Sequence, residues 1–380
     1  MPGSIARLRG FLNAPAKRAS RDSGGGTAKG GNEPAGPQRT DRPALCFLAV
    51  SFLVASDPIH AQPIYKPEYR LSVAVGTSYA WGKGAETWAA LVRERTAGRI
   101  NIRVFPGASA TGGDPANEFE ALRTRAVDFA VGSALNWAPR VKPLHLFALP
   151  FFVGSDRRLD AILASPAATT LFTAVAAAGV VPLAWGDNGF RELATAERAI
   201  GKPADLAGLR IRVSGPAIFD DVVSTLGGVP VRSNWPDAQK ALLDGTLQGV
   251  ETSPAVYVVT KAQTLGLRHL VLWSITAEPL IFAVSKGAWE EWSEADREIV
   301  RGAAREAAAR EIEQTRVTTA AAIERVGRDL RGAVTVLRPD QEQRAAFATA
   351  LEPVVRRWSG EAGDAVVDEA KRAADAAAAR

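Results

Sequence analysis

Thiols and imidazoles are almost absent from this sequence. Its 380 residues contain one cysteine, Cys46, and three histidines. A chain with a single thiol forms no internal disulfide, and with so few sulfur and nitrogen ligands we expect no transition-metal site. The sequence also lacks G-x-S-x-G and a phosphate loop ending in Gly-Lys-Ser/Thr, and Thr87 stands where Gly82-Lys83-Gly84 would need a third glycine to bind a dinucleotide. We therefore expect no cofactor.

The histidines do not suggest catalysis either. His60 lies near the N-terminus, His145 lies in an apolar block and His269 follows Arg268. Nothing in their spacing favours a Ser/His/Asp triad, so we expect that the protein is not an enzyme. A secreted enzyme remains a third hypothesis, which a turnover lost with His145→Ala or His269→Ala would support.

The first 61 residues differ in composition from the rest. Residues 1–40 are rich in glycine, serine, proline and basic residues without an apolar period, which predicts disorder. The apolar run Ala44–Ala55 has 12 residues, fewer than the roughly 20 that cross a bilayer. Basic residues precede this run and Ala61 follows it, which is typical of a secretory signal peptide; a buried core segment is the alternative. Cys46 opens the run after Leu45 instead of closing it after a small residue, so we expect no lipidation.

The positive charge lies mostly in this leader. The formal net charge is +5, and residues 1–61 hold eight basic and four acidic residues, so their removal leaves about +1. This small charge gives no reason to expect nucleic-acid binding. We expect residues 1–61 to be a disordered basic leader plus signal peptide, and the remainder to be a thiol-free periplasmic protein.

The rest of the chain alternates between strand-like and helix-like patterns. Apolar residues at every second position predict strands, and apolar residues at helical spacing predict helices between them. Strand, helix and strand in succession indicate βαβ units with parallel pairing. We expect strands at 69–75, 100–107, 129–131, 180–185, 209–213, 228–231 and 280–285, and helices around 88–98, at 158–178 and 216–226, within 236–251 before a turn, from Ser293 to about Leu330, and within 339–380.

Several segments, in order, resemble the substrate-binding subunit of tripartite ATP-independent periplasmic (TRAP) transporters, a family similar to dicarboxylate-binding proteins. The resemblance runs from Leu71 to about Ala308. It rests on LVRERTAGRINIRVFPGA (91–108), FALPFF (147–152), NGFRELAT (188–195) and DLAGLRIRV (205–213), followed by LGGVPV, ALLDGTLQGVE and SKGAWEEWSEADREIVRGAA.

The resemblance implies an α/β, two-domain periplasmic-binding-protein-like fold of type II. Mixed sheets would be flanked by helices, and a long C-terminal helix would span both domains. We place domain I at 62–188 with 277–316 and domain II at 189–276 with 317–380, with the ligand cleft between them.

The same resemblance implies a function. The protein would be an extracytoplasmic solute-binding protein that captures a small organic acid by domain closure and delivers it, as a monomer, to a TRAP-type membrane permease. The alternative from another class is a receptor subunit that presents an organic acid to a sensor kinase. Neighbouring genes would separate the two hypotheses.

Two arginines alternate with apolar residues in the stretch Asp205–Pro216, DLAGLRIRVSGP. On a strand, the apolar residues face one side while Arg210 and Arg212 face the other. The resemblance aligns the family's conserved arginine with Arg212, which implies that its planar guanidinium clamps a carboxylate through two parallel hydrogen bonds. Arg210 matches a variable position, so we expect it at the rim or in solvent.

The resemblance implies three further ligand contacts. Arg191 matches the family's second arginine, Trp235 matches an aromatic residue that packs on the ligand, and Thr252 replaces an amide that commonly contacts it. A capping role is the alternative for Arg191, and a place in the core is the alternative for Trp235. Glu251 could ligate a cation, but we interpret it as an ordinary acid at a helix end.

Four more residues are weaker candidates for substrate binding. Asp114 could hold a ligand hydroxyl or amine, with a simple turn as the alternative. Tyr79, Asn136 and Trp137 follow the ends of predicted strands, which is where open α/β sheets bind ligands.

Overall fold

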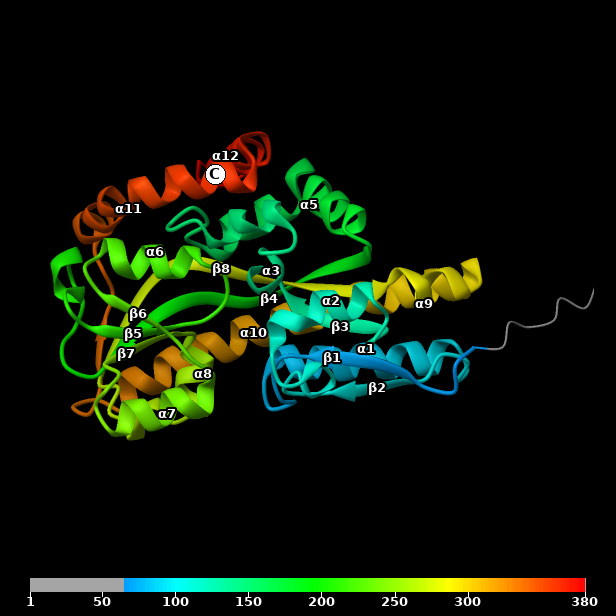
Figure 1. The fold of residues 1–380 in the computed structure, drawn as a ribbon, viewed down its shortest axis with the longest axis horizontal. Coiled ribbons are helices and arrows are strands. Elements are labelled where there is room, and N and C mark those ends of the chain that lie inside the picture. The colour runs from blue at the N-terminus through cyan, green and yellow to red at the C-terminus, as the bar shows by residue number, and fades with distance from the viewer. Residues whose placement is uncertain (1–64, 380) are drawn as a thin grey trace, which may run out of the picture. The chain divides into compact units, whose positions relative to one another are not determined.

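Two long antiparallel strands form the middle of the sheet. A computed structural model describes residues 65–379 of the chain. In it, β4 (Val180–Thr195) pairs with β8 (His269–Ser285) over most of their length. The strand order is β2-β1-β3-β8-β4-β7-β5-β6, with β9 (Thr335–Leu337) also paired to β8 (Figure 1). The shorter strands thus gather at the two ends of this central pair.

One end of the sheet consists of three parallel strands. β1 (Tyr69–Val73) lies between β2 (Ile102–Phe105) and β3 (Phe129–Ser133), and β3 runs antiparallel to residues 280–284 of β8. α1 (Ala80–Arg95) connects β1 to β2 and is followed by Gly98 at φ 79°, a left-handed conformation that glycine adopts without strain. The predicted βαβ unit is confirmed here.

A second parallel group forms the other end. β5 (Arg210–Val213) lies between β6 (Val229–Arg232) and β7 (Gly249–Thr252), and β7 runs antiparallel to the last residues of β4. α6 (Ile218–Thr225) connects β5 to β6, and α7 (Trp235–Leu243) connects β6 to β7. Along β5 the burial alternates as the sequence predicts, because Ile211 and Val213 are buried while Arg210 is exposed.

The longest helix, α10 (Glu294–Asp329), crosses both groups of strands. Its 36 residues give a length of about 54 Å. It begins where the Ser293 hydroxyl accepts a hydrogen bond from the backbone N–H of Asp296. Helix α10 contacts α1 and β4, and also α8 (Pro254–Val259) and β9. The predicted long helix is therefore confirmed, as is its path past elements from both ends of the sheet.

The other helices cover the sheet and fill its connections. They are α2 (Glu118–Arg123), α3 (Ala134–Trp137), α4 (Asp156–Leu163), α5 (Pro166–Ala177), α9 (Lys286–Glu291), α11 (Gln341–Ala362) and α12 (Asp364–Ala378), with short 3-10 turns at Ser109–Thr111, Pro115–Asn117, Lys142–Ala148, Pro203–Leu206 and Ala262–Leu265. Helix α11 packs on α6 and on the turn at Lys142–Ala148, and α12 packs on α4 and α5 (Figure 1). These two C-terminal helices therefore tie the chain before β4 to the chain after it.

Several predicted elements were wrong in extent; the strand expected at 280–285, for example, begins at His269. The helix expected at 158–178 is two helices bent by 65°, because Pro166 begins the second one and cannot continue the first. The strand expected at 180–185 continues to Thr195, with bulges that shift its pairing with β8. The residues expected to form a turn after α7 include β7, where Gly249 allows close approach of the Ala194 carbonyl and the Ile211 side chain.

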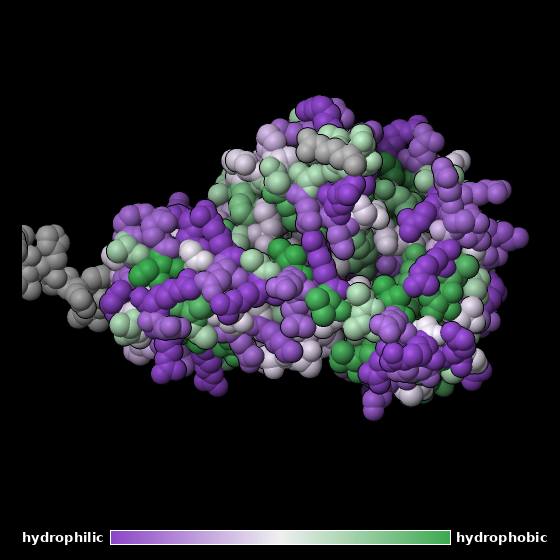
Figure 2. Space-filling model, turned by 180° about the vertical axis from the view of Figure 1, so that it is seen from behind, coloured by the Kyte–Doolittle hydropathy of each residue, from purple (hydrophilic) through white to green (hydrophobic). Residues whose placement is uncertain are grey.

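The surface is polar over most of the face shown in Figure 2, with apolar side chains in smaller patches. Among the described helices no single one is long and apolar enough to cross a membrane. The bent pair α4 and α5 meets the length and composition criteria together, and Leu159, Leu171 and Val175 of this pair are buried in the core. The predicted leader, signal peptide and Cys46 lie outside the described residues.

A buried acid marks the contact between α10 and β4. Glu311 is 2% exposed; its Oε2 accepts the backbone N–H of Asp187 at 2.9 Å, and its Oε1 accepts the Thr315 hydroxyl at 2.7 Å. Burial raises the pKa of Glu311 to about 8 and that of Asp187 to about 6. Both carboxyl groups therefore keep their protons to a higher pH in the folded chain than in the unfolded chain. The stability that this difference contributes is fully present below the unfolded pKa and is lost as the pH rises through the folded pKa.

We predict that Glu311→Gln flattens this pH dependence. The amide stays neutral, so the free energy of unfolding should fall less between about pH 5 and about pH 9 than in the wild type. Urea unfolding across this range measures the effect, and Glu313→Gln, an exposed neighbour on α10, serves as the control. An identical slope in Glu311→Gln and wild type would contradict the assignment.

Candidate functional site

Arg212 on β5 is half-buried and only partly engaged. Its Nε donates to the backbone carbonyl of Ser233 at 3.1 Å, which fixes the plane of the guanidinium. Its two Nη groups have no hydrogen-bond partner among the residues that the structure describes. Burial lowers the pKa of Arg212 and the charge of Glu251 opposes that effect, but a guanidinium stays protonated at any physiological pH. Two free, coplanar donors are the complement of a carboxylate.

Arg191 on β4, in contrast, is enclosed by two carboxylates. Its Nε and Nη2 donate to Oε2 and Oε1 of Glu251 at 2.6 and 2.8 Å, and its Nη1 donates to Oε2 of Glu278 at 3.0 Å. The side chains of Arg191, Glu251 and Glu278 are 12%, 11% and 8% exposed. All three guanidinium nitrogens of Arg191 are therefore used within the protein.

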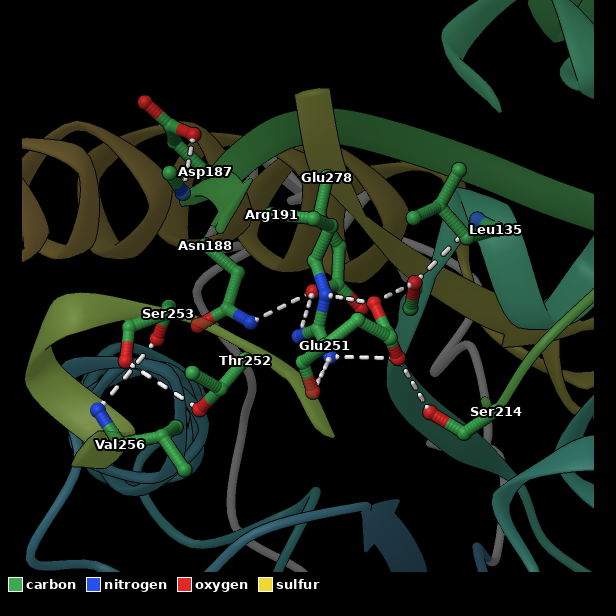
Figure 3. Close-up of polar contacts among 12 residues, drawn as sticks. Leu135, Asp187, Asn188, Arg191, Ser214, Glu251, Thr252, Ser253, Val256 and Glu278 are labelled. Atoms are coloured by element: carbon green, nitrogen blue, oxygen red, sulfur yellow. Dashed lines mark hydrogen bonds and ion pairs between the residues drawn. The ribbon is translucent and has the colours of Figure 1, made fainter. Parts of the chain in front are cut away.

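Three small polar side chains complete this group (Figure 3). The Ser214 hydroxyl donates to Oε1 of Glu251, the Ser133 hydroxyl donates to Oε1 of Glu278, and the Asn188 amide donates to Oε2 of Glu278, each at 2.8 Å. We call these residues the Arg191 cluster: Arg191, Glu251, Glu278, Ser133, Asn188 and Ser214. They come from β3, β4, β7, β8 and the end of β5, so both groups of strands contribute to it.

The charges of the cluster hold one another in the ionised state. Burial alone would raise the pKa of Glu251, but the charge and hydrogen bonds of Arg191, together with the charge of Arg212, hold that pKa below its ordinary value. Burial alone would lower the pKa of Arg191, and the charges of Glu251 and Glu278 raise it instead. Glu251 is thus a carboxylate at neutral pH.

Two of the weaker candidates lie near these groups. The Oδ1 of Asn136 is 3.7 Å from the position that a Cβ on Gly215 would occupy, so Asn136 lies beside the residues that follow β5. Tyr79 lines a cavity of about 230 Å³ together with Asn188, Ser253 and residues of α8 and α10. Since Asn188 also donates to Glu278, this cavity reaches the edge of the Arg191 cluster.

The structure gives other candidates local contacts of their own. Thr252 is 4% exposed and its hydroxyl donates to the Ser253 carbonyl at 3.3 Å. Trp235 is half-buried at the start of α7 and packs against the apolar cluster that contains Tyr257 and Leu270. Their contact with a ligand stays a prediction.

Two candidates are used structurally. Asp114 is exposed, and its side chain accepts the backbone N–H of Ala116 at 2.9 Å, as a turn aspartate does. Trp137 is 0% exposed and packs its ring on Phe119, with centroids 5.4 Å apart. Neither makes a hydrogen bond to the Arg191 cluster within the described part of the chain.

The interpretation of Glu251 as a helix-end acid was wrong. It lies within β7 and is held by Arg191 and Ser214, because the chain after α7 returns to the sheet. Within residues 65–379 no group of three or more His, Cys, Asp or Glu side chains is arranged to hold a metal ion.

Sequence reasoning missed Glu278, Ser133 and the role of Asn188. A signal for Glu278 was present, since it is the one charged residue in the apolar run ITAEPLIFAVS that forms most of β8. A buried charge needs a partner, so a lone acid in an apolar strand indicates a buried ion pair. Which cation it meets could not be read from local sequence.

Comparison with known proteins finds a family and solved structures that match most of the chain. The family DctP, bacterial extracellular solute-binding protein, family 7, matches residues 71–361. A crystallised TRAP periplasmic solute-binding protein from Ralstonia eutropha H16, with bound (S)-2-acetolactate, is 40% identical, covers 83% of this chain and 100% of that one, and has a TM-score of 0.79. A solute-binding protein from Verminephrobacter eiseniae is 27% identical over 80% of this chain and 88% of its own length.

A more distant structure has the same fold. A TRAP periplasmic solute-binding protein from Sulfurospirillum deleyianum, with bound succinate, is 22% identical, covers 80% of this chain and 98% of that one, and has a TM-score of 0.72. At this identity the likeness concerns the fold alone.

We predict that Glu251→Gln destabilises the fold. The substitution removes one of the two charges that compensate the buried Arg191, which should cost about 3 kcal/mol in the free energy of unfolding. Urea unfolding at neutral pH measures this, with Glu361→Gln, which breaks the exposed ion pair with Lys142, as a control that should match the wild type. Equal stability of Glu251→Gln and wild type would show that the ion pair is not buried as described.

Proposed function

Because the chain belongs to the bacterial extracellular solute-binding proteins of family 7, we propose that Arg212 is the residue that holds the carboxylate of its cargo. The protein is a solute-binding component of a TRAP transporter and not an enzyme: it captures a small organic acid and passes it to the membrane permease. The alternative role as a receptor for a sensor kinase receives no support from these relatives.

The observation that carries the proposal is the unequal state of the two arginines. Arg191 has each of its three guanidinium nitrogens bonded to Glu251 or Glu278, whereas Arg212 has its Nε fixed by the Ser233 carbonyl and both Nη groups without a partner among the described residues. A partly desolvated cation with its orientation already set pays little to bind a carboxylate. Arg191 then acts through the cluster, by holding Glu251 beside Arg212, and not as a second open clamp.

The cargo that we propose is a small 2-hydroxy acid. Support comes from the Ralstonia eutropha protein, which at 40% identity was crystallised with (S)-2-hydroxy-2-methyl-3-oxobutanoate. The Arg191 cluster offers carboxylate oxygens that can accept a hydrogen bond from a ligand hydroxyl, in addition to the cation that binds its acid group. Asn136, Tyr79, Trp235 and Thr252 remain the proposed walls of this site.

Closure would take place between two domains, 62–188 with 277–316 and 189–276 with 317–380. The strand order supports this division, because β8 pairs with β3 of one group and β4 pairs with β7 of the other, while α10 contacts α1 on one side and α8 on the other. One C-terminal helix crosses the proposed boundary, because α12 is assigned to the second domain and packs on α4 and α5 of the first domain. Domain closure must therefore either keep the contacts of α12 with α4 and α5 or let these helices slide past one another.

The proposed location and assembly state rest on sequence and family. Proteins of this family are periplasmic, as the name of the Ralstonia eutropha relative states. We assign export to a signal peptide within residues 1–61 without lipidation, and we propose that the exported chain acts as a monomer.

We predict that Arg212→Ala abolishes most of the response to organic acids. An acid present at 100 times its Kd should stabilise the wild type by about 2.7 kcal/mol. Removing the buried partner should weaken binding at least about 30-fold, equivalent to about 2 kcal/mol. Thermal shift and calorimetry over a panel of small organic acids measure both effects.

Arg210→Ala is the matched control, since Arg210 lies two residues earlier on β5, is exposed, and donates its Nε to the Thr246 carbonyl. It should bind like the wild type. If Arg212→Ala does so as well, Arg212 is not the clamp; if the wild type binds no acid of the panel, the proposed class of cargo is wrong.

A further inference from the structure

We propose that Glu278 makes this site selective for monocarboxylates, because it pairs with Arg191 and leaves Arg212 as the open cation beside the Arg191 cluster. The inference rests on the proposed function and deepens it from an organic acid to an acid with a single carboxylate. A dicarboxylate would need a second cation, and Arg191 and Arg232 already pair with carboxylates of the protein. Arg325 lines the cavity that Tyr79 and Asn188 share, but its side chain is 63% exposed and its Nε lies 4.0 Å from Asp329, so its charge is screened by solvent.

The first candidate for a second cation is Arg191. Glu251 accepts hydrogen bonds from its Nε and Nη2, and Glu278 accepts one from its Nη1. One positive charge therefore faces two negative charges, so the Arg191 cluster as a whole is negative beside Arg212. A second ligand carboxylate placed here would meet a net repulsion, and of the five N–H groups of Arg191 only one, on Nη1, is without a partner among the described residues.

The second candidate is Arg232, at the end of β6 next to the strand that carries Arg212. Its Nη1 donates to the Gly215 carbonyl at 2.9 Å, and its Nη2 pairs with Asp220. Its side chain is 48% exposed, so its charge is both compensated by Asp220 and screened by solvent. Arg232 thus does not replace Arg191 as a receptor for a second carboxylate.

Glu278 is fixed in its position by two further donors. The hydroxyl of Ser133 on β3 donates to it at 2.8 Å. The amide of Asn188 on β4 also donates to it at 2.8 Å (Figure 3). The side chain is 8% exposed, so rotating away from Arg191 would leave a buried carboxylate without its cation. A ligand cannot easily displace it, and this distinguishes Glu278 from an exposed partner that would yield to an incoming anion.

The test compares acids that differ by one carboxylate. The matched probes are 2-hydroxy-2-methylbutanoate against 2-hydroxy-2-methylbutanedioate, lactate against malate, and butanoate against succinate. Calorimetry gives Kd for each probe with the wild type, Glu278→Gln and Glu192→Gln. We expect the wild type to prefer the monocarboxylates by about tenfold or more, equivalent to about 1.4 kcal/mol.

Glu278→Gln should shift this ratio at least about tenfold toward the dicarboxylates, because it removes a negative charge that would repel the second ligand carboxylate. Glu192→Gln is the matched control. Glu192 follows Arg191 on β4 and is 4% exposed. It accepts hydrogen bonds from the backbone N–H and the hydroxyl of Ser274 instead of from the Arg191 cluster. Its ratio should equal that of the wild type.

The possible outcomes separate this inference from the proposed function. A wild type that binds dicarboxylates as well as or better than monocarboxylates overturns the inference, as does a ratio that Glu278→Gln leaves unchanged or that Glu192→Gln shifts equally. If the wild type binds none of the six acids, the proposed function fails, and the inference fails with it. A shifted ratio in Glu278→Gln with Arg212 still required for binding supports both.

Discussion

The burial of charge around Arg191 is the constraint on which the site depends. A guanidinium and two carboxylates that are each about one-tenth exposed must satisfy one another, because an unpaired ion in such surroundings costs several kcal/mol. Glu251 and Glu278 meet that demand, and both carboxylates also accept hydrogen bonds from serine or asparagine side chains. What remains is Arg212, the partly buried cation whose two Nη groups have no partner among the described residues. The ability of the site to bind an anion follows from this difference between Arg191 and Arg212.

The fold makes the arrangement possible because its two central strands run the length of the sheet. β4 carries Asn188 and Arg191, and β8 carries Glu278, at the region where the pairing of the two strands shifts register. A bulge turns a side chain that regular pairing would direct elsewhere, which is how Asn188 comes to face Glu278. Ser133 arrives from one group of strands and Glu251 from the other, so relative movement of the two ends would act directly on the cluster.

Sequence reasoning predicted the fold class, the βαβ units, the long helix and the prominence of Arg212, because each leaves a local pattern or a run of family-like segments. It did not predict the partners of Arg191, which lie 60 and 87 residues away along the chain at Glu251 and Glu278. No period or motif links such positions. The error over Glu251 had a local cause, since a helix followed by glycine resembles a terminus even where the next residues re-enter the sheet. The break at Pro166 was also missed, although proline chemistry alone indicates it.

The most direct test is a crystal structure of the protein with an organic acid bound in solution before crystallisation. The account predicts a single ligand carboxylate paired with both Nη groups of Arg212 at roughly 2.7–2.9 Å, while Arg191 keeps its contacts to Glu251 and Glu278. A map in which Arg191 has left Glu278 to grip the ligand, or in which the acid lies away from Arg212, would contradict it.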